Sequence, residues 1–286
     1  MTEERDDTAG KAQLRIATYN THKSRGLDGR VRPQRIVEVL RELDADLIAL
    51  QEVVSHSGRE READQARYFA EELGYFSAMG ENRTHKGGAY GNVVLTRFPI
   101  QTLYNYDIST AGRERRGCLR TDIKFGKNVL HIFNVHMGTA FFERRKQARK
   151  LLAQDILENR DLVGARVILG DFNEWSRGLA SRLFTDRFQS ADPRRYLSRG
   201  RTYPGMLPFL HLDHIYFDPL LMLNRLNLHR SRKALLASDH LPLVADFAWR
   251  SPINAPRTDL AVVPLTIPAA DTSSPIHTSL SSVRAV

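Results

Sequence analysis

The spacing of apolar residues along the chain predicts a mixture of strands and helices. The segment from Leu14 to Tyr19 is typical of a strand, and the uninterrupted apolar run from Leu47 to Leu50 is typical of a strand buried on both faces. Over residues 33–43, apolar side chains recur at the spacing of one helix face, and Pro33 suits the first turn. The same criteria predict helices over 60–73 and 143–159 and strands over 92–96, 119–125, 129–135, 166–169, 211–217, 222–228 and 243–249.

The order of these elements favours mixed or antiparallel sheets layered with helices. Helices and strands do not alternate strictly, and the strands over 119–125 and 129–135 are close enough in sequence to form a hairpin. We expect one α/β domain over residues 14–250, preceded by a flexible segment over 1–13.

A disordered tail is expected over residues 251–286. There the composition shifts to Pro, Ser, Ala and Thr, without apolar residues in periodic order. Because such a segment has no apolar face to bury, a chain ending at Arg250 should keep its melting temperature and its activity. Thermal unfolding of the two chains side by side checks this. A large drop in melting temperature for the shorter chain would show that the tail packs on the domain.

The chain is basic, with a formal net charge of +9 at pH 7. A basic surface attracts anions, so anionic phosphoesters, nucleic acid and anionic membrane surfaces are all compatible partners. With Cys118 as the one cysteine, no intramolecular disulfide can form. The N-terminus lacks a secretory signal, and no apolar run approaches the roughly 20 residues of a membrane span. We therefore expect a cytoplasmic protein without a transmembrane segment, and the sequence identifies no protein partner.

The strongest local signal is a predicted strand that ends in glycine and an Asp-x-Asn motif. On extended backbone, residues two apart project to the same face, so Asp171 and Asn173 would point together into a site at the strand's end. A carboxylate and an amide there can bind a hard metal ion, a phosphoryl oxygen or a nucleophilic water. Taken alone, a polar turn after a strand explains the motif about as well.

Two further signals involve Asp239-His240 and Asp213. Asp239 and His240 precede the predicted strand over 243–249, and such a pair can bind a metal through one group and offer an imidazole through the other. A surface turn ended by Pro242 is the alternative. Asp213 lies in an apolar strand pattern, where orienting a histidine would offset the cost of burying its charge. A solvent-facing charge at a strand end is the alternative here.

Polar residues also end three other predicted strands, at Asn20, Glu52 and His136. Open layered folds tend to place ligand sites at strand ends. Each residue alone could be a solvated cap, but their repetition at separate strand ends favours a common site. Together with the motifs above, they supply the oxygen donors and imidazoles that Mg²⁺-assisted hydrolysis of a phosphoester requires, with Mn²⁺ as a possible replacement.

Two cations lie close in sequence to these polar strand ends. Lys23 follows Asn20 by three residues, and Arg116 precedes the predicted strand over 119–125. Either side chain could contact a substrate phosphate. A place on a solvated basic surface is an equally good explanation of each.

In combination, these segments resemble the endonuclease/exonuclease/phosphatase superfamily, which is also called DNase I-like. The matching stretches are IATYN (16–20), LIALQEV (47–53), GNVVLTRFPI (91–100), NVHMG (134–138), LGDFNEW (169–175), LDHIYF (212–217) and SDHLPL (238–243). The resemblance implies a four-layered α/β sandwich, in which two packed mixed β-sheets are flanked by helices and the site lies at one end. It also implies metal-dependent hydrolysis of a phosphate ester.

The resemblance assigns roles to the polar residues. It implies that Asn20 and Glu52 form the first metal-binding pair, with Asp239 as a further carboxylate of the metal site. It implies that Asp171 and Asn173 activate the water and contact the phosphate.

The two histidines complete the implied site. His240 would bind phosphate or act as a general base, oriented by Asp213. His136 matches the second histidine of the DNase I and sphingomyelinase branches. Abasic-site endonucleases have a tyrosine in this region instead. The sequence offers no carboxylate to orient His136.

Several functions remain compatible with the sequence. The preferred function is hydrolysis of a phosphodiester, whose substrate is a small-molecule or lipid-derived head group or nucleic acid. The first alternative is a DNA or RNA endo- or exonuclease. The second alternative is a non-catalytic interaction module with the same fold. A DNA-binding protein without enzymatic activity is a third possibility, but the sequence contains no zinc-finger pattern and no recognisable helix-turn-helix signature. Residues 55–64 offer no aromatic wedge for a duplex, which puts small or lipid-derived esters slightly ahead of duplex DNA.

Overall fold

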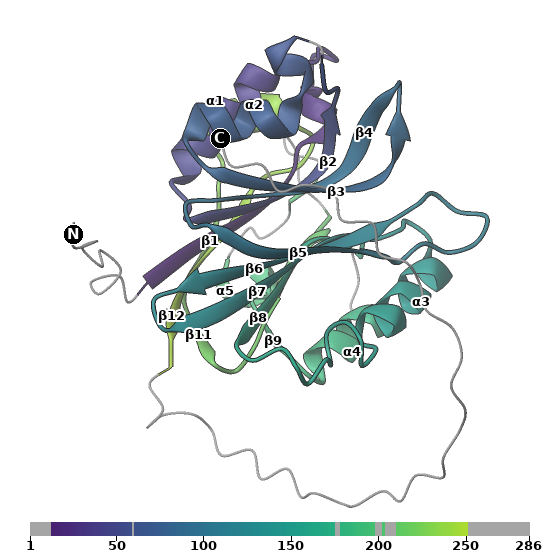
Figure 1. The fold of residues 1–286 in the computed structure, drawn as a ribbon, viewed down its shortest axis with the longest axis vertical. Helices are drawn as coiled ribbons and strands as arrows, with labels where there is room; N and C mark the ends of the chain where they lie inside the picture. The colour runs from purple at the N-terminus through teal and green to yellow at the C-terminus, as the bar shows by residue number, and fades with distance from the viewer. Residues whose placement is uncertain (1–12, 59, 175–177, 198–201, 204–209, 251–286) are drawn as a thin grey trace, which may run out of the picture.

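Two six-stranded sheets pack against each other and carry helices on their outer faces (Figure 1). The computed structural model describes residues 13–58, 60–174, 178–197, 202–203 and 210–250. The first sheet contains, in spatial order, β11 (Leu221–Leu228), β12 (Leu243–Trp249), β1 (Gln13–Asn20), β2 (Leu47–Ser55), β4 (Gly88–Thr96) and β3 (Phe76–His85). The second contains β5 (Ile100–Asp107), β6 (Gly117–Phe125), β7 (Asn128–His136), β8 (Ala165–Asp171), β10 (Asp213–Phe217) and β9 (Gln189–Ser190).

Each sheet is built around one parallel pair of strands. β1 and β2 are parallel at the centre of the first sheet, and β7 and β8 are parallel at the centre of the second. The other strand pairs are antiparallel. Both sheets are therefore mixed, as predicted, and the expected hairpin of β6 and β7 is confirmed.

Helices cover the outer face of each sheet. Figure 1 shows α1 (Pro33–Leu43) and α2 (Gln65–Leu73) on one side, and α3 (Phe141–Leu151) and α4 (Leu179–Thr185) on the other. The remaining helices are α5 (Pro193–Tyr196), α6 (Arg232–Ala237) and the 3-10 turns η1 (His22–Ser24) and η2 (Arg61–Ala63). The predicted four-layered sandwich is thus confirmed. None of the described helices is long and apolar enough to cross a membrane.

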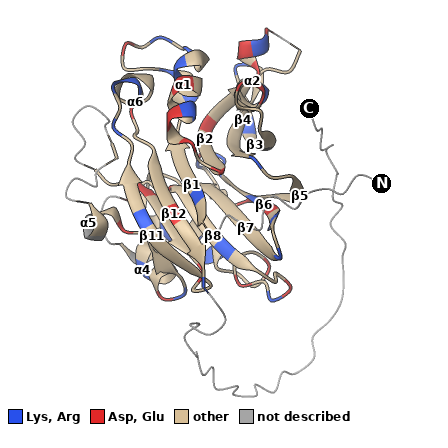
Figure 2. Cartoon of the chain, turned by 90° about the vertical axis from the view of Figure 1, so that its left-hand side faces the viewer, with Lys and Arg blue, Asp and Glu red and all other residues tan. Residues whose placement is uncertain are grey.

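Amphipathic patterning explains how the outer layers attach. Ile36, Val39, Leu40 and Leu43 of α1 are all buried and join the core of the first sheet. Figure 2 shows acidic and basic residues intermixed on α1 and α2, and several of them pair, including Arg41 with Glu72 at 2.6 Å. These two helices therefore turn an apolar face inward and a charge-balanced face outward.

Several predicted boundaries are wrong. The strands expected over 47–50 and 92–96 are longer, at Leu47–Ser55 and Gly88–Thr96. The helix expected over 143–159 ends at Leu151, where turn-type hydrogen bonds, such as Ile156 N–H to the carbonyl of Ala153 at 3.1 Å, replace the helical ones. The helix expected over 60–73 begins at Gln65, after a 3-10 turn and a bridge between Ser55 and Asp64. The strand expected over 211–217 begins at Asp213, opposite the end of β8. Gln13 already belongs to β1, while the flexibility expected for the rest of 1–13 and for 251–286 falls outside the described residues.

Candidate functional site

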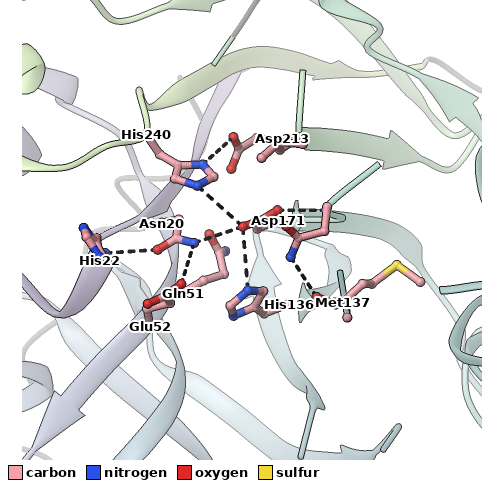
Figure 3. A network of polar contacts seen from close by, with 12 residues as sticks. Asn20, His22, Gln51, Glu52, His136, Met137, Asp171, Asp213 and His240 are labelled. Atoms are coloured by element: carbon pink, nitrogen blue, oxygen red, sulfur yellow. Dashed lines mark hydrogen bonds and ion pairs between the residues drawn. The ribbon is translucent and has the colours of Figure 1, made fainter. Parts of the chain in front are cut away.

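The topology brings the predicted polar residues to one end of the sandwich. Asn20 and His136 end β1 and β7, Asp171 ends β8, and Glu52 lies near the end of β2. Since both parallel pairs point the same way at this end, their final residues meet across the gap between the sheets (Figure 3).

The antiparallel neighbours contribute their first residues to the same end. β10 begins at Asp213, which is paired in register with Asp171. β12 runs antiparallel to β1, with Leu243 opposite Thr18, so Asp239 and His240 just before it lie beside the end of β1. Residues that are far apart in the sequence therefore share one site because of strand order and direction.

Asp171 is the centre of the contacts at this site (Figure 3). Its Oδ2 accepts a hydrogen bond from Asn20 Nδ2 at 2.9 Å and lies 3.7 Å from Nε2 of both His136 and His240. The backbone N–H of Asn173 donates to its Oδ1 at 2.8 Å. This carboxylate, which is almost fully buried, thus stands between two imidazoles with one amide donor on each oxygen.

A β-bulge in β2 turns Glu52 into the site. The register between β2 and β4 shifts between Leu50 and Val53, and Glu52 has a φ of 57°. A positive φ is unfavourable for glutamate, and such strain tends to occur at functional sites. The side chain of Asn134 donates to the carbonyl of Leu50 at 2.9 Å and accepts from Gln51 Nε2 at 2.7 Å, so hydrogen bonds from the second sheet support the bulge.

The carboxylate of Glu52 is held in its charged form. Its Oε1 accepts a hydrogen bond from Asn20 Nδ2 at 3.3 Å, and Oε2 forms an ion pair with Lys23. Burial alone would raise the pKa of Glu52, but the charges of His136 and Lys23 and the hydrogen bonds lower it to about 2. At neutral pH, where His136 is uncharged, Lys23 remains the cation beside this carboxylate.

The neighbouring carboxylates stabilise the protonated form of His240. Its Nδ1–H donates to Asp213 Oδ2 at 3.0 Å, as the sequence predicted for an orienting aspartate. Burial by itself lowers the pKa of His240, but Asp213 and Asp171 outweigh burial and raise it to about 10. His240 therefore faces the cleft as an imidazolium, with the ring of Tyr203 at a centroid distance of 4.9 Å.

His136 is in the opposite protonation state. Burial and the charge of Arg116 lower the pKa of His136 to about 4. Arg116 Nη1 lies 3.0 Å from Nδ1 and 3.2 Å from Nε2. Because a guanidinium can only donate, one ring nitrogen must accept, which a neutral imidazole can do. The orienting partner that the sequence did not reveal is thus an arginine. With Arg116 turned toward His136, its contact with a substrate phosphate remains a prediction.

These residues open onto a cleft of about 330 Å³. Its lining includes the predicted Lys23, Glu52, Arg116, His136, Asp171, Asn173, Asp239 and His240. Asn20 and Asp213 are buried just behind the surface, at 1% and 0% exposure. The structure therefore brings all ten predicted residues together, eight of them on the wall of the cleft.

Sequence reasoning missed three polar residues of the cleft. His22 lies with its Nδ1 3.4 Å from Asp239 Oδ1, and its backbone N–H donates to Asn20 Oδ1 at 3.0 Å. Thr139 and Tyr203 also line the cleft. His22 stands two residues after Asn20, which is a signal that could have been used, whereas Tyr203 has no spacing that links it to the site.

The oxygen donors suit a hard divalent cation. Glu52, Asp239 and the carbonyl oxygen of the Asn20 amide are the groups that could hold one, and Mg²⁺ commonly takes one or two carboxylates and keeps several waters. Among the residues that the structure describes, no group of three or more His, Cys, Asp or Glu side chains is arranged to hold a metal ion. The Mg²⁺ expected from the sequence therefore remains a prediction.

Comparisons with known proteins bear on the family and the fold. A model of the Endonuclease/Exonuclease/phosphatase family matches residues 17–240. The uncharacterized protein YbhP of Escherichia coli K12 is 29% identical over 223 residues, which are 73% of this chain and 87% of that protein.

Solved structures share the fold. An endonuclease/exonuclease/phosphatase from Beutenbergia cavernae superimposes with a TM-score of 0.67 at 21% identity, covering 84% of this chain and 72% of that one. A mannosyl-6-phosphatase from Bacteroides thetaiotaomicron gives a TM-score of 0.65 at 18% identity, covering 82% of this chain and 100% of that one.

Proposed function

The chain belongs to the endonuclease/exonuclease/phosphatase family, and we propose that it is a Mg²⁺-dependent phosphoesterase that cleaves a phosphodiester by in-line attack of water. The observation that carries this proposal is the buried carboxylate of Asp171, whose Oδ2 lies 3.7 Å from Nε2 of both His136 and His240. The surroundings lower the pKa of His136 and raise the pKa of His240. Groups whose environments separate their pKa values in this way can divide acid and base roles at one pH.

The residues of the cleft can perform distinct parts of the reaction. Asp171 can accept a proton from the attacking water, which Asn173 helps to orient. His240, as an imidazolium, can donate a hydrogen bond to a phosphoryl oxygen and stabilise the charge that develops there. His136, held neutral by burial and Arg116, can donate from the ring nitrogen that keeps its proton to a second phosphoryl oxygen.

Glu52, with Asn20 and Asp239, would hold the divalent cation. The bound ion would supply Lewis-acid polarisation of the phosphate. Lys23 already neutralises Glu52 in the structure and stands at the mouth of the cleft. A substrate phosphate that binds there would give Lys23 a second anionic partner.

We expect a small-molecule or lipid-derived phosphodiester to be a slightly better substrate than duplex DNA. The histidine at position 136 and the lack of an aromatic wedge over 55–64 support this, although the net charge of +9 suits DNA equally well. Competition kinetics measure the preference. The nuclease alternative prevails if kcat/KM for a duplex oligonucleotide exceeds that of every lipid or small phosphodiester by about tenfold or more.

A substrate screen tests the proposed class of activity. The protein is supplied with Mg²⁺ or Mn²⁺ and assayed on plasmid DNA, RNA, sphingomyelin, phosphoinositides and chromogenic phosphodiesters. Cleavage of any of these at a phosphate ester, dependent on Asp171, supports the proposal. A folded protein that cleaves none of them would favour the non-catalytic module instead.

A further inference from the structure

The exposed face of α3 differs from the charge-balanced helices on the other side of the molecule. α3 carries five cations and a single carboxylate, Glu143, which is buried. Lys146, Arg149 and Lys150 are exposed. None of them has a salt bridge within 4 Å among the described residues, although the charge of Lys150 helps to lower the pKa of Asp107. By contrast, Arg41 and Arg61 near α1 and α2 both pair with glutamates. The exposed side of α3 therefore carries a larger excess of positive charge than α1 and α2.

Two phenylalanines extend this face toward the cleft. Phe141 and Phe142 are 49% and 72% exposed, and their rings meet edge to face at a centroid distance of 5.5 Å. Phe142, Lys146, Arg149 and Lys150 follow helical spacing and share one side of α3, which we call the α3 basic face. Exposed adjacent phenyl rings beside exposed cations are typical of an interaction surface.

The α3 basic face begins at the rim of the cleft. α3 starts five residues after His136, and Thr139 in the connecting segment lines the cleft. Arg144 of α3 forms a hydrogen bond with the carbonyl of Thr139, so the segment is tied to the helix. Whatever binds the phenylalanines is therefore placed beside the opening through which a phosphate ester must enter.

We propose that the α3 basic face docks the protein on an anionic membrane surface. Phe142 would enter the boundary between headgroups and acyl chains, and Lys146, Arg149 and Lys150 would face anionic lipid headgroups. This proposal rests on the exposed surface of α3. Docking on a membrane would also bring the cleft close to the lipid-derived ester expected under the proposed function.

Two other occupants fit this face less well. Successive bases stack on parallel aromatic faces, whereas the two phenyl rings are inclined at 79°. Insertion among lipid chains makes no such demand on ring orientation. A second copy of the chain would bring one set of cations against another, which is unfavourable.

Vesicle flotation tests the proposal without any substrate or metal. We expect the protein to bind vesicles of phosphatidylcholine with about 30% phosphatidylglycerol at least tenfold more tightly than vesicles of phosphatidylcholine alone. The reason is that anionic headgroups attract basic segments. Lys146→Glu/Lys150→Glu should lose at least tenfold of that binding. Lys124→Glu/Lys127→Glu is the matched control, because it makes the same charge change at the opposite end of β6 and β7. This control should stay within about twofold of the wild type.

Phe142→Ser separates lipid insertion from general attraction. The side chain is largely exposed, so the variant should keep its melting temperature while losing about tenfold in vesicle binding. The proposal is overturned if the wild type does not distinguish the two vesicles, or if both double variants weaken binding equally. It is also overturned if Phe142→Ser and the α3 double variant weaken binding to a single-stranded oligonucleotide instead. Because hydrolysis is not measured, failure of docking and failure of the proposed activity are distinguishable.

Discussion

Asp171→Asn and His240→Ala should each lower kcat by about 10² or more while leaving the fold intact. The amide introduced by Asp171→Asn could keep the hydrogen bond from Asn20 but could not take a proton from water. Loss of the His240 ring removes the imidazolium that Asp213 and Asp171 maintain. Steady-state kinetics on a phosphodiester, with thermal unfolding of each variant, measure both effects.

Matched controls separate these losses from general effects of substitution. Asp186→Asn changes an exposed carboxylate after α4, and His229→Ala removes a histidine that pairs with Glu42 on the surface. Neither residue lines the cleft. Both controls should retain wild-type kcat, and wild-type kcat in Asp171→Asn or His240→Ala would exclude that residue from the mechanism.

Removal of divalent metal should abolish turnover. Extensive dialysis against EDTA followed by assay in EDTA measures this, and added Mg²⁺ or Mn²⁺ should restore the rate. The reason is that oxygen donors such as Glu52 and Asp239 bind hard cations, which then polarise the phosphate. Full activity in EDTA would contradict this prediction.

Glu52→Gln locates the metal requirement. The substitution removes the principal charge at the expected metal site, so the Mg²⁺ concentration at half-maximal rate should rise by about tenfold or more. Glu38→Gln is a control of the same type on α1, where Glu38 pairs with Lys233 at 3.2 Å. An unchanged Mg²⁺ dependence in Glu52→Gln would remove this residue from the metal site.

The architecture was predictable where local pattern and burial agree. The helix over 33–43 was predicted to its last residue because its apolar face is buried and Pro33 sets its start. β3 and β5 were missed because they lie at sheet edges, where exposed polar residues interrupt the alternation that marks a half-buried strand.

Much of the candidate site followed from polar residues at strand ends. A buried strand that ends in Asp171, or one that begins at Asp213, leaves a visible polar break in an apolar pattern. The sequence could not show which breaks meet, since that depends on strand order and direction. The resemblance to a known superfamily supplied the missing arrangement.

Contacts that depend on register and backbone twist were beyond sequence reasoning. Arg116 reaches His136 because Cys118 is paired with Val135, which brings the ends of β6 and β7 together. Lys23 reaches Glu52 from a short turn with positive φ values, opposite a bulge that also has a positive φ. Neither conformation is favoured by the residues concerned, so tertiary context must impose it.

Turnover of a chromogenic phosphodiester by the wild type and by Asp171→Asn, each prepared in EDTA and then supplied with Mg²⁺, is the most direct test of the proposed function. Metal-dependent hydrolysis by the wild type, reduced by about 10² or more in the variant, is the predicted result. Equal rates for the two proteins in Mg²⁺ would contradict it, because the hydrolysis would then not arise from the cleft around Asp171.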